Sequence, residues 1–170
     1  MQQPATTALL RAATSTFESL VLLFPEPLAI EGAEFLPIAA AVDVAYGGAQ
    51  TGRVAVAVTA GVLPALAENM LGAAAAPDGQ LQRDALGELA NVVTGNVLPL
   101  VHGAAAVFRL AAPVAAIPGP FHPRAGERQV AMVRLQMDEG EALLALFEQD
   151  GGAAPDDSGA GAARVAAAAA

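Results

Sequence analysis

Apolar residues recur at helical spacing over residues 80–103, which read QLQRDALGELANVVTGNVLPLVHG. They follow one another at intervals of three or four: Leu86, Leu89, Val93, Val97 and Leu100. This spacing is typical of a helix that buries one face. We therefore expect a long helix here, which Pro99 should kink or end.

The opposite face of this predicted helix is polar and poorly suited to a helix. At about 100° per residue, that face holds Asp84, Glu88, Asn91 and Gly95. Asp84 and Glu88 are like charges one turn apart, which costs a few tenths of a kcal/mol. Asn and Gly are each roughly 0.5–1 kcal/mol less favourable than Ala inside a helix. Because these departures gather on one face, we interpret that face as a functional site.

Alternating apolar residues predict two β-hairpins. The first joins strands over 39–46 and 53–59 through a glycine-rich turn, and the second joins 130–137 to 141–147. Shorter strands are expected over 106–110 and 114–117. Together with the helices, these strands predict an α+β domain in which helices pack on a mainly antiparallel sheet.

Two further helices are predicted. One begins after a cap at Thr6 or Thr7 and stops before Pro25 and Pro27. The other covers 60–71 and ends at Gly72. Asp78 is a candidate N-cap for the helix that carries the polar face.

The composition changes at the end of the chain. Residues 1–150 predict one domain, whereas residues 151–170 are almost entirely Gly, Ala, Asp and Ser. Such a segment buries too little apolar surface to order itself, so we expect a disordered tail.

Composition also excludes several function classes. The net charge of −9 argues against a nucleic-acid partner and an anionic membrane. The chain has no lysine and no cysteine, which removes lysine and thiolate catalysis and zinc–thiolate sites. The two isolated histidines, His102 and His122, predict no metal site, and His102 fits a cation at a helix end better than a catalytic base. We expect a cytoplasmic protein without a membrane span.

The order Asp84-x3-Glu88-x2-Asn91, within ELANVVTGN, resembles the active-site helix of the CheC/CheX chemotaxis phosphatases. Residues 41–72 are similar to the hairpin and following helix of CheX, and Pro113 matches a proline beyond the family's motif. The resemblance covers roughly residues 6–148. It implies a fold built from two related halves with approximate twofold symmetry. Because no other helix carries Glu-x-x-Asn, it also implies one site per chain, as in CheX.

The resemblance implies hydrolysis of the phospho-aspartate on a CheY-like response-regulator receiver domain. Asn91 would orient the attacking water and Glu88 would pair with a lysine of the receiver, as the catalytic pair. Asp84 and Gly95 would support the site, and Gly87 and Gly95 would admit another backbone. The protein would need no cofactor of its own, because Mg²⁺ would come with the receiver. A homodimer is also expected by resemblance to CheX.

Three other interpretations stay open. A non-catalytic receiver-binding or structural module could keep the fold without turnover. Glu88 and Asn91 could be ordinary solvated residues on a surface helix, in an alanine-rich domain of unrelated purpose. Gly95 could serve helix packing.

Overall fold

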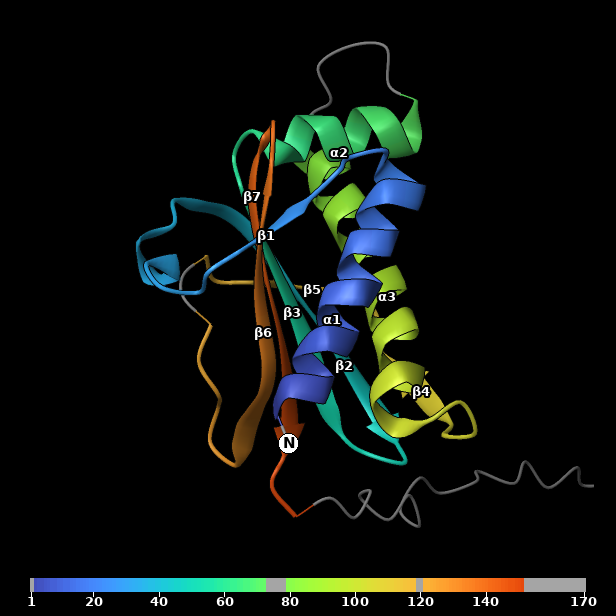
Figure 1. Cartoon of the computed structure of the whole chain (residues 1–170). Coiled ribbons are helices and arrows are strands. Elements are labelled where there is room, and N and C mark those ends of the chain that lie inside the picture. Colours follow the sequence, from blue (N-terminus) through green and yellow to red (C-terminus); the bar gives the residue numbers. More distant parts are fainter. Residues whose placement is uncertain (1, 73–78, 119–120, 152–170) are drawn as a thin grey trace, which may run out of the picture.

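The fold is a sheet with helices on one face. A computed structural model describes residues 2–72, 79–118 and 121–151. In Figure 1 the sheet is seen near its edge, with α1, α2 and α3 on one side and the segment around η2 on the other. The helices are α1 (Gln2–Thr16), η1 (a π-helix, Phe17–Val21), η2 (a 3₁₀ turn, Ala33–Phe35), α2 (Val62–Leu71) and α3 (Gly79–His102). The strands are β1 (Glu26–Leu28), β2 (Ile38–Gly48), β3 (Gly52–Thr59), β4 (Phe108–Leu110), β5 (Val114–Ala116), β6 (Glu127–Met137) and β7 (Gly140–Gln149).

The sheet topology has an approximate twofold symmetry. The strand order is β1-β6-β7-β3-β2-β4, and β5 also pairs with β2. Every pairing is antiparallel. The units α1-β1-β2-β3 and α3-β4/β5-β6-β7 therefore correspond: each short strand pairs with the long hairpin of the other unit, and β3 pairs with β7 at the centre. The α+β prediction with a mainly antiparallel sheet is confirmed.

Alternation along the strands determines which residues face the helices. In β3, Val54, Val56 and Val58 belong to the main core with the helices, whereas Ala55 and Ala57 belong to small clusters on the other face. That second face is covered by the segments that contain Ala33 and Phe121, which pack against these clusters.

The structure corrects several sequence-based boundaries. The first helix begins at Gln2, before the predicted caps Thr6 and Thr7, and continues as a π-helix to Val21. Pro27, predicted only to end a helix, lies in strand β1 at the sheet edge, where proline is tolerated. Pro99 lies within the last turn of α3, which runs on to His102.

Leu100 was predicted to be buried but is 44% exposed, and Leu98 is buried instead. The predicted end of α2 is confirmed: Gly72 has a left-handed conformation, and its N–H donates to Glu68 O at 2.9 Å. The proposed cap Asp78 and the predicted tail from residue 152 onward lie outside the described residues. Within the described parts of the chain, none of the helices is long and apolar enough to cross a membrane.

Candidate functional site

Helix α3 presents the predicted polar face away from the core. Its opposite side buries Leu86, Leu89 and Val93 against the other helices and the sheet. Asp84, Glu88 and Gly95 are exposed and Asn91 is half-buried, which follows from their positions around the helix. All four predicted site residues therefore lie on one accessible surface, which we call the α3 polar face.

The asparagines show how unusual Asn91 is. Asn69 Nδ2 donates to Val21 O at 2.7 Å and closes the end of the π-helix. Asn96 Nδ2 donates to Thr16 Oγ1 at 3.1 Å and links α3 to α1. Asn91 makes no side-chain hydrogen bond with any residue in the ranges 2–72, 79–118 and 121–151. Its carboxamide therefore keeps both donor and acceptor available to a partner.

The carboxylates of this face differ from each other. Asp84 Oδ1 accepts a hydrogen bond from Gln80 Nε2 at 2.7 Å, and Gln80 Oε1 accepts one from Arg83 at 3.1 Å. Glu88 has no ion pair and no side-chain hydrogen bond among the described residues. Glu88 and Asn91, predicted as the catalytic pair, are thus the two functional groups of the face with no use inside the described fold.

The two glycines of α3 have different surroundings. A Cβ at Gly87 would lie 3.3 Å from Cβ of Pro113, so Gly87 accommodates a side chain of this chain. That Gly87 admits a partner's backbone stays a prediction. A Cβ at Gly95 would meet no described atom within 4 Å, so helix packing within the described chain does not explain Gly95. Its supporting role at an interface stays a prediction.

Both histidines have structural surroundings. His102 ends α3 with Nε2 at 3.1 Å from Glu148 Oε1, at ion-pair distance but off the direction of a hydrogen bond, and its ring lies against Phe108. The backbone carbonyl of His122 accepts a hydrogen bond from Arg53 at 3.0 Å. His102 therefore packs within the fold at the end of α3, and its role as a cation there stays a prediction.

A buried ion cluster on the other face of the sheet was not predicted. Arg53 lies 3.1 Å from Asp43 and 3.0 Å from Glu127, and its guanidinium stacks 4.1 Å above the ring of Phe147. Arg124 also pairs with Asp43, and we call these four charged residues the Arg53 cluster. The sequence indicated this cluster only through charged residues that alternate with apolar residues along the strands.

The charges of the Arg53 cluster set the ionisation of Glu127. Burial by itself would raise the pKa of this carboxyl. The hydrogen bonds from the Arg53 side chain and the Arg124 backbone, together with both guanidinium charges, outweigh burial and hold the pKa below its ordinary value. Glu127 is therefore ionised at neutral pH and serves the fold.

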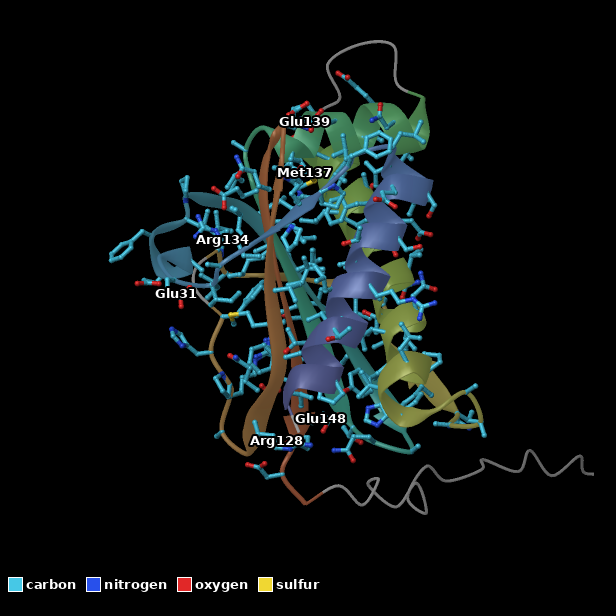
Figure 2. The ribbon with its side chains drawn as sticks, in the orientation of Figure 1. Glu31, Arg128, Arg134, Met137, Glu139 and Glu148 are labelled. Carbon is cyan, nitrogen blue, oxygen red and sulfur yellow. The ribbon has the colours of Figure 1, made fainter. Side chains whose placement is uncertain are left out.

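Other arginines link neighbouring segments of the sheet, mainly β6 and β7. Arg134 donates to Glu31 O at 3.0 Å and to Glu141 at 2.6 Å, and Arg128 pairs with Glu148. Figure 2 shows Arg134 near Glu31 on the side away from the helices, and Arg128 beside Glu148 at the end of the sheet. These arginines therefore have partners within the fold.

Comparisons with known proteins show which proteins have a similar fold. No protein-family model and no curated protein matches the chain. Solved structures of CheX and CheC-like chemotaxis proteins match it over most of its length. The chain therefore has the CheC/CheX fold, and the predicted resemblance is confirmed at the level of the fold.

Three of these structures illustrate the range of the similarity. The chemotaxis protein CheX from Vibrio vulnificus has a TM-score of 0.69 and 18% identity, covering 87% of this chain and 99% of that one. The CheX chain of the CheX-CheY-BeF3-Mg²⁺ complex from Borrelia burgdorferi gives 0.57 and 15%, covering 85% and 97%. The FliM middle domain from H. pylori gives 0.55 and 11%, covering 87% and 91%.

Proposed function

We propose that this protein is a phosphatase that hydrolyses the phospho-aspartate of a CheY-like receiver domain and so ends a two-component or chemotaxis signal in the cytoplasm. One observation carries the proposal: the carboxylate of Glu88 and the carboxamide of Asn91 share one accessible helix face and have no partner among the described residues. The fold shared with CheX, and the complex of a CheX with CheY, support the choice of partner.

Asn91 fits the chemical task of the reaction. Hydrolysis of an acyl phosphate needs a water molecule held in line with the phosphorus–oxygen bond that breaks. A carboxamide can accept a hydrogen bond from this water with its oxygen and donate one to a phosphoryl oxygen with its nitrogen. In this proposal Asn91 enters the receiver's pocket and stabilises the transition state by holding the water.

Glu88 lies three residues before Asn91 and fits a docking role. An exposed carboxylate on a rigid helix can pair with a lysine beside the receiver's phosphorylated aspartate. Such a pair adds affinity and orientation without taking part in bond breaking.

The metal in this reaction would come with the partner. Over the three described ranges, the chain holds no group of three or more His, Asp or Glu placed to bind a metal ion. In this proposal the Mg²⁺ that neutralises the phosphoryl group comes with the receiver. This chain's own residues dock, exclude bulk water and position the nucleophile.

The test uses the full chain and phosphorylated receiver domains from the same genome. We expect the protein to shorten the lifetime of at least one phosphorylated receiver in the presence of Mg²⁺. Receiver binding without any acceleration of phosphate release would favour the non-catalytic interaction module instead. That alternative has its own support, because the FliM middle domain shares the fold.

We also propose that the protein forms a homodimer. The outer side of β6 pairs with β1 only at Arg134, Leu135 and Gln136, so much of this long strand lacks a partner there among the described strands. Unpaired strand edges readily pair with another chain. Light scattering at micromolar concentration should give about twice the chain mass, and a monomer mass would contradict the proposal.

A further inference from the structure

A groove open to solvent runs along the first half of α3, beside the α3 polar face. It has a volume of about 620 Å³. One wall is α3 itself, and the other is formed by the start of β2 and by the β5 segment. Pro113 packs against Gly87 where the two walls meet. Glu88 lines the groove as well, so the groove is continuous with the proposed site.

The α3 wall of the groove is mostly polar and carries two carboxylates and one guanidinium. Its lining side chains are those of Gln80, Arg83, Asp84, Leu86 and Glu88. The hydrogen bonds from Arg83 to Gln80 and from Gln80 to Asp84 hold one oxygen of the Asp84 carboxylate. The Asp84 carboxylate has no ion-pair partner in the described chain. This wall therefore complements a cation that arrives from outside.

The opposite wall is apolar and made of small residues. Ala39 and Ala115 line it, and their short side chains leave the groove open. Beside this wall, in and just after β5, Val114 and Ile117 are 65% and 92% exposed. This apolar wall has exposed aliphatic residues beside it and faces the carboxylate of Asp84, which lacks an ion pair in the described chain. Such a groove is suited to an apolar side chain next to a basic one.

We propose that this groove is a second docking site for the receiver, which determines which receivers the protein accepts. The occupant is a receiver loop beside the phosphorylated aspartate: an apolar side chain enters between α3 and Ala115, and a neighbouring cationic side chain pairs with Asp84. This inference rests on the proposed function, and it gives Asp84 a role in recognition rather than in chemistry. The size of the residues at 39 and 115 limits which side chain fits.

The test fills the groove from two positions on its apolar wall without touching Glu88 or Asn91. Ala115→Tyr and Ala39→Tyr each add a ring to an exposed strand position, where tyrosine is well tolerated. Ala104→Tyr places the same ring at an exposed turn that does not line the groove and serves as the matched control. The rate of receiver dephosphorylation is measured over a range of protein concentrations.

Both filling variants should raise the half-saturating concentration about tenfold to a hundredfold, because the ring competes with the receiver for the same space. The rate at saturation should change by less than about twofold. Asp84→Asn should weaken binding about twofold to fivefold and reduce its dependence on salt. Ala104→Tyr should match the wild type in both quantities.

If both filling variants fold and bind the receiver as the wild type does, the groove is not a docking site. The proposed function would remain intact. A wild-type protein that binds receivers without hydrolysis, and loses binding in the filling variants, would overturn the proposed function and retain the groove. An equal loss of receiver binding in Ala104→Tyr would also contradict the proposed docking site, because the effect would not depend on the position of the ring.

Discussion

The Arg53 cluster and the α3 polar face contain the same kinds of charged side chain in opposite situations. In the cluster, the side chains of Arg53, Asp43 and Glu127 are 6%, 11% and 4% exposed and pair at 3.0–3.1 Å. On α3, Asp84 and Glu88 are exposed and form no ion pair with the described residues.

The difference separates charges that hold the fold from charges that the described fold does not use. A charge can be buried only with partners, because removing it from water costs several kcal/mol. An exposed carboxylate needs none, and alanine would be a better helix residue at its position. Among the described residues the buried charges are paired, whereas Asp84 and Glu88 on α3 form no ion pair.

The largest expected effect comes from breaking the buried cluster. Arg53→Met leaves Asp43 and Glu127 buried without their main cation, so the free energy of unfolding should fall by about 3–5 kcal/mol. Arg83→Met, on the exposed side of α3, should lower it by less than about 0.5 kcal/mol. Urea denaturation measures both, and equal effects would contradict the distinction between the two regions.

Acid should remove the contribution of Glu127 to the stability of the Arg53 cluster. The pKa of Glu127 in the folded protein lies below its ordinary value of 4.5. Glu127 therefore contributes stability above pH 4.5, and this contribution is lost as the pH falls through the lower, folded pKa. The melting temperature of the wild type should fall over this window more steeply than that of Glu127→Gln, and parallel profiles would contradict the assignment.

Removing a charge from the α3 polar face should affect binding and not stability. Glu88→Ala should weaken receiver binding about tenfold and make the remaining binding less sensitive to salt. Glu68→Ala removes an equal charge from the exposed side of α2 and should leave binding unchanged. Titrations at two ionic strengths distinguish the variants, and identical curves would remove Glu88 from the interface.

The smallest effect is expected from the end of the chain. Deleting residues 151–170 should shift the melting temperature by less than about 2 °C, because the segment has almost no apolar surface to bury. A fall of many degrees would show that it docks on the domain.

Local patterns predicted most of the fold. The alternation in both hairpins and the helical spacing of α3 are repeated signals, and the structure contains all three elements. Strand β1 could not be predicted, because its three residues include Pro27 and form an edge only when β6 lies beside them. The start of α1 was placed too late because Gln2 and Gln3 carry no clear cap.

The site was predictable where it depends on one helix and hidden where it depends on distant segments. Spacing within α3 placed Asp84, Glu88, Asn91 and Gly95 on one face. The Arg53 cluster joins residues 43, 53, 124 and 127, and the contact of Pro113 with Gly87 spans 26 residues of chain, so no local pattern reveals either one. The groove, made by such contacts, was therefore missed as well.

The most direct measurement compares two asparagines of the same helix at saturating receiver. Asn91→Ala should lower the limiting rate of dephosphorylation by roughly 10²- to 10³-fold while receiver binding changes little, because the carboxamide acts chiefly in the transition state. Asn96→Ala, which loses only the hydrogen bond to Thr16, should keep the wild-type rate. A folded Asn91→Ala protein that dephosphorylates the receiver at the wild-type rate would contradict the account.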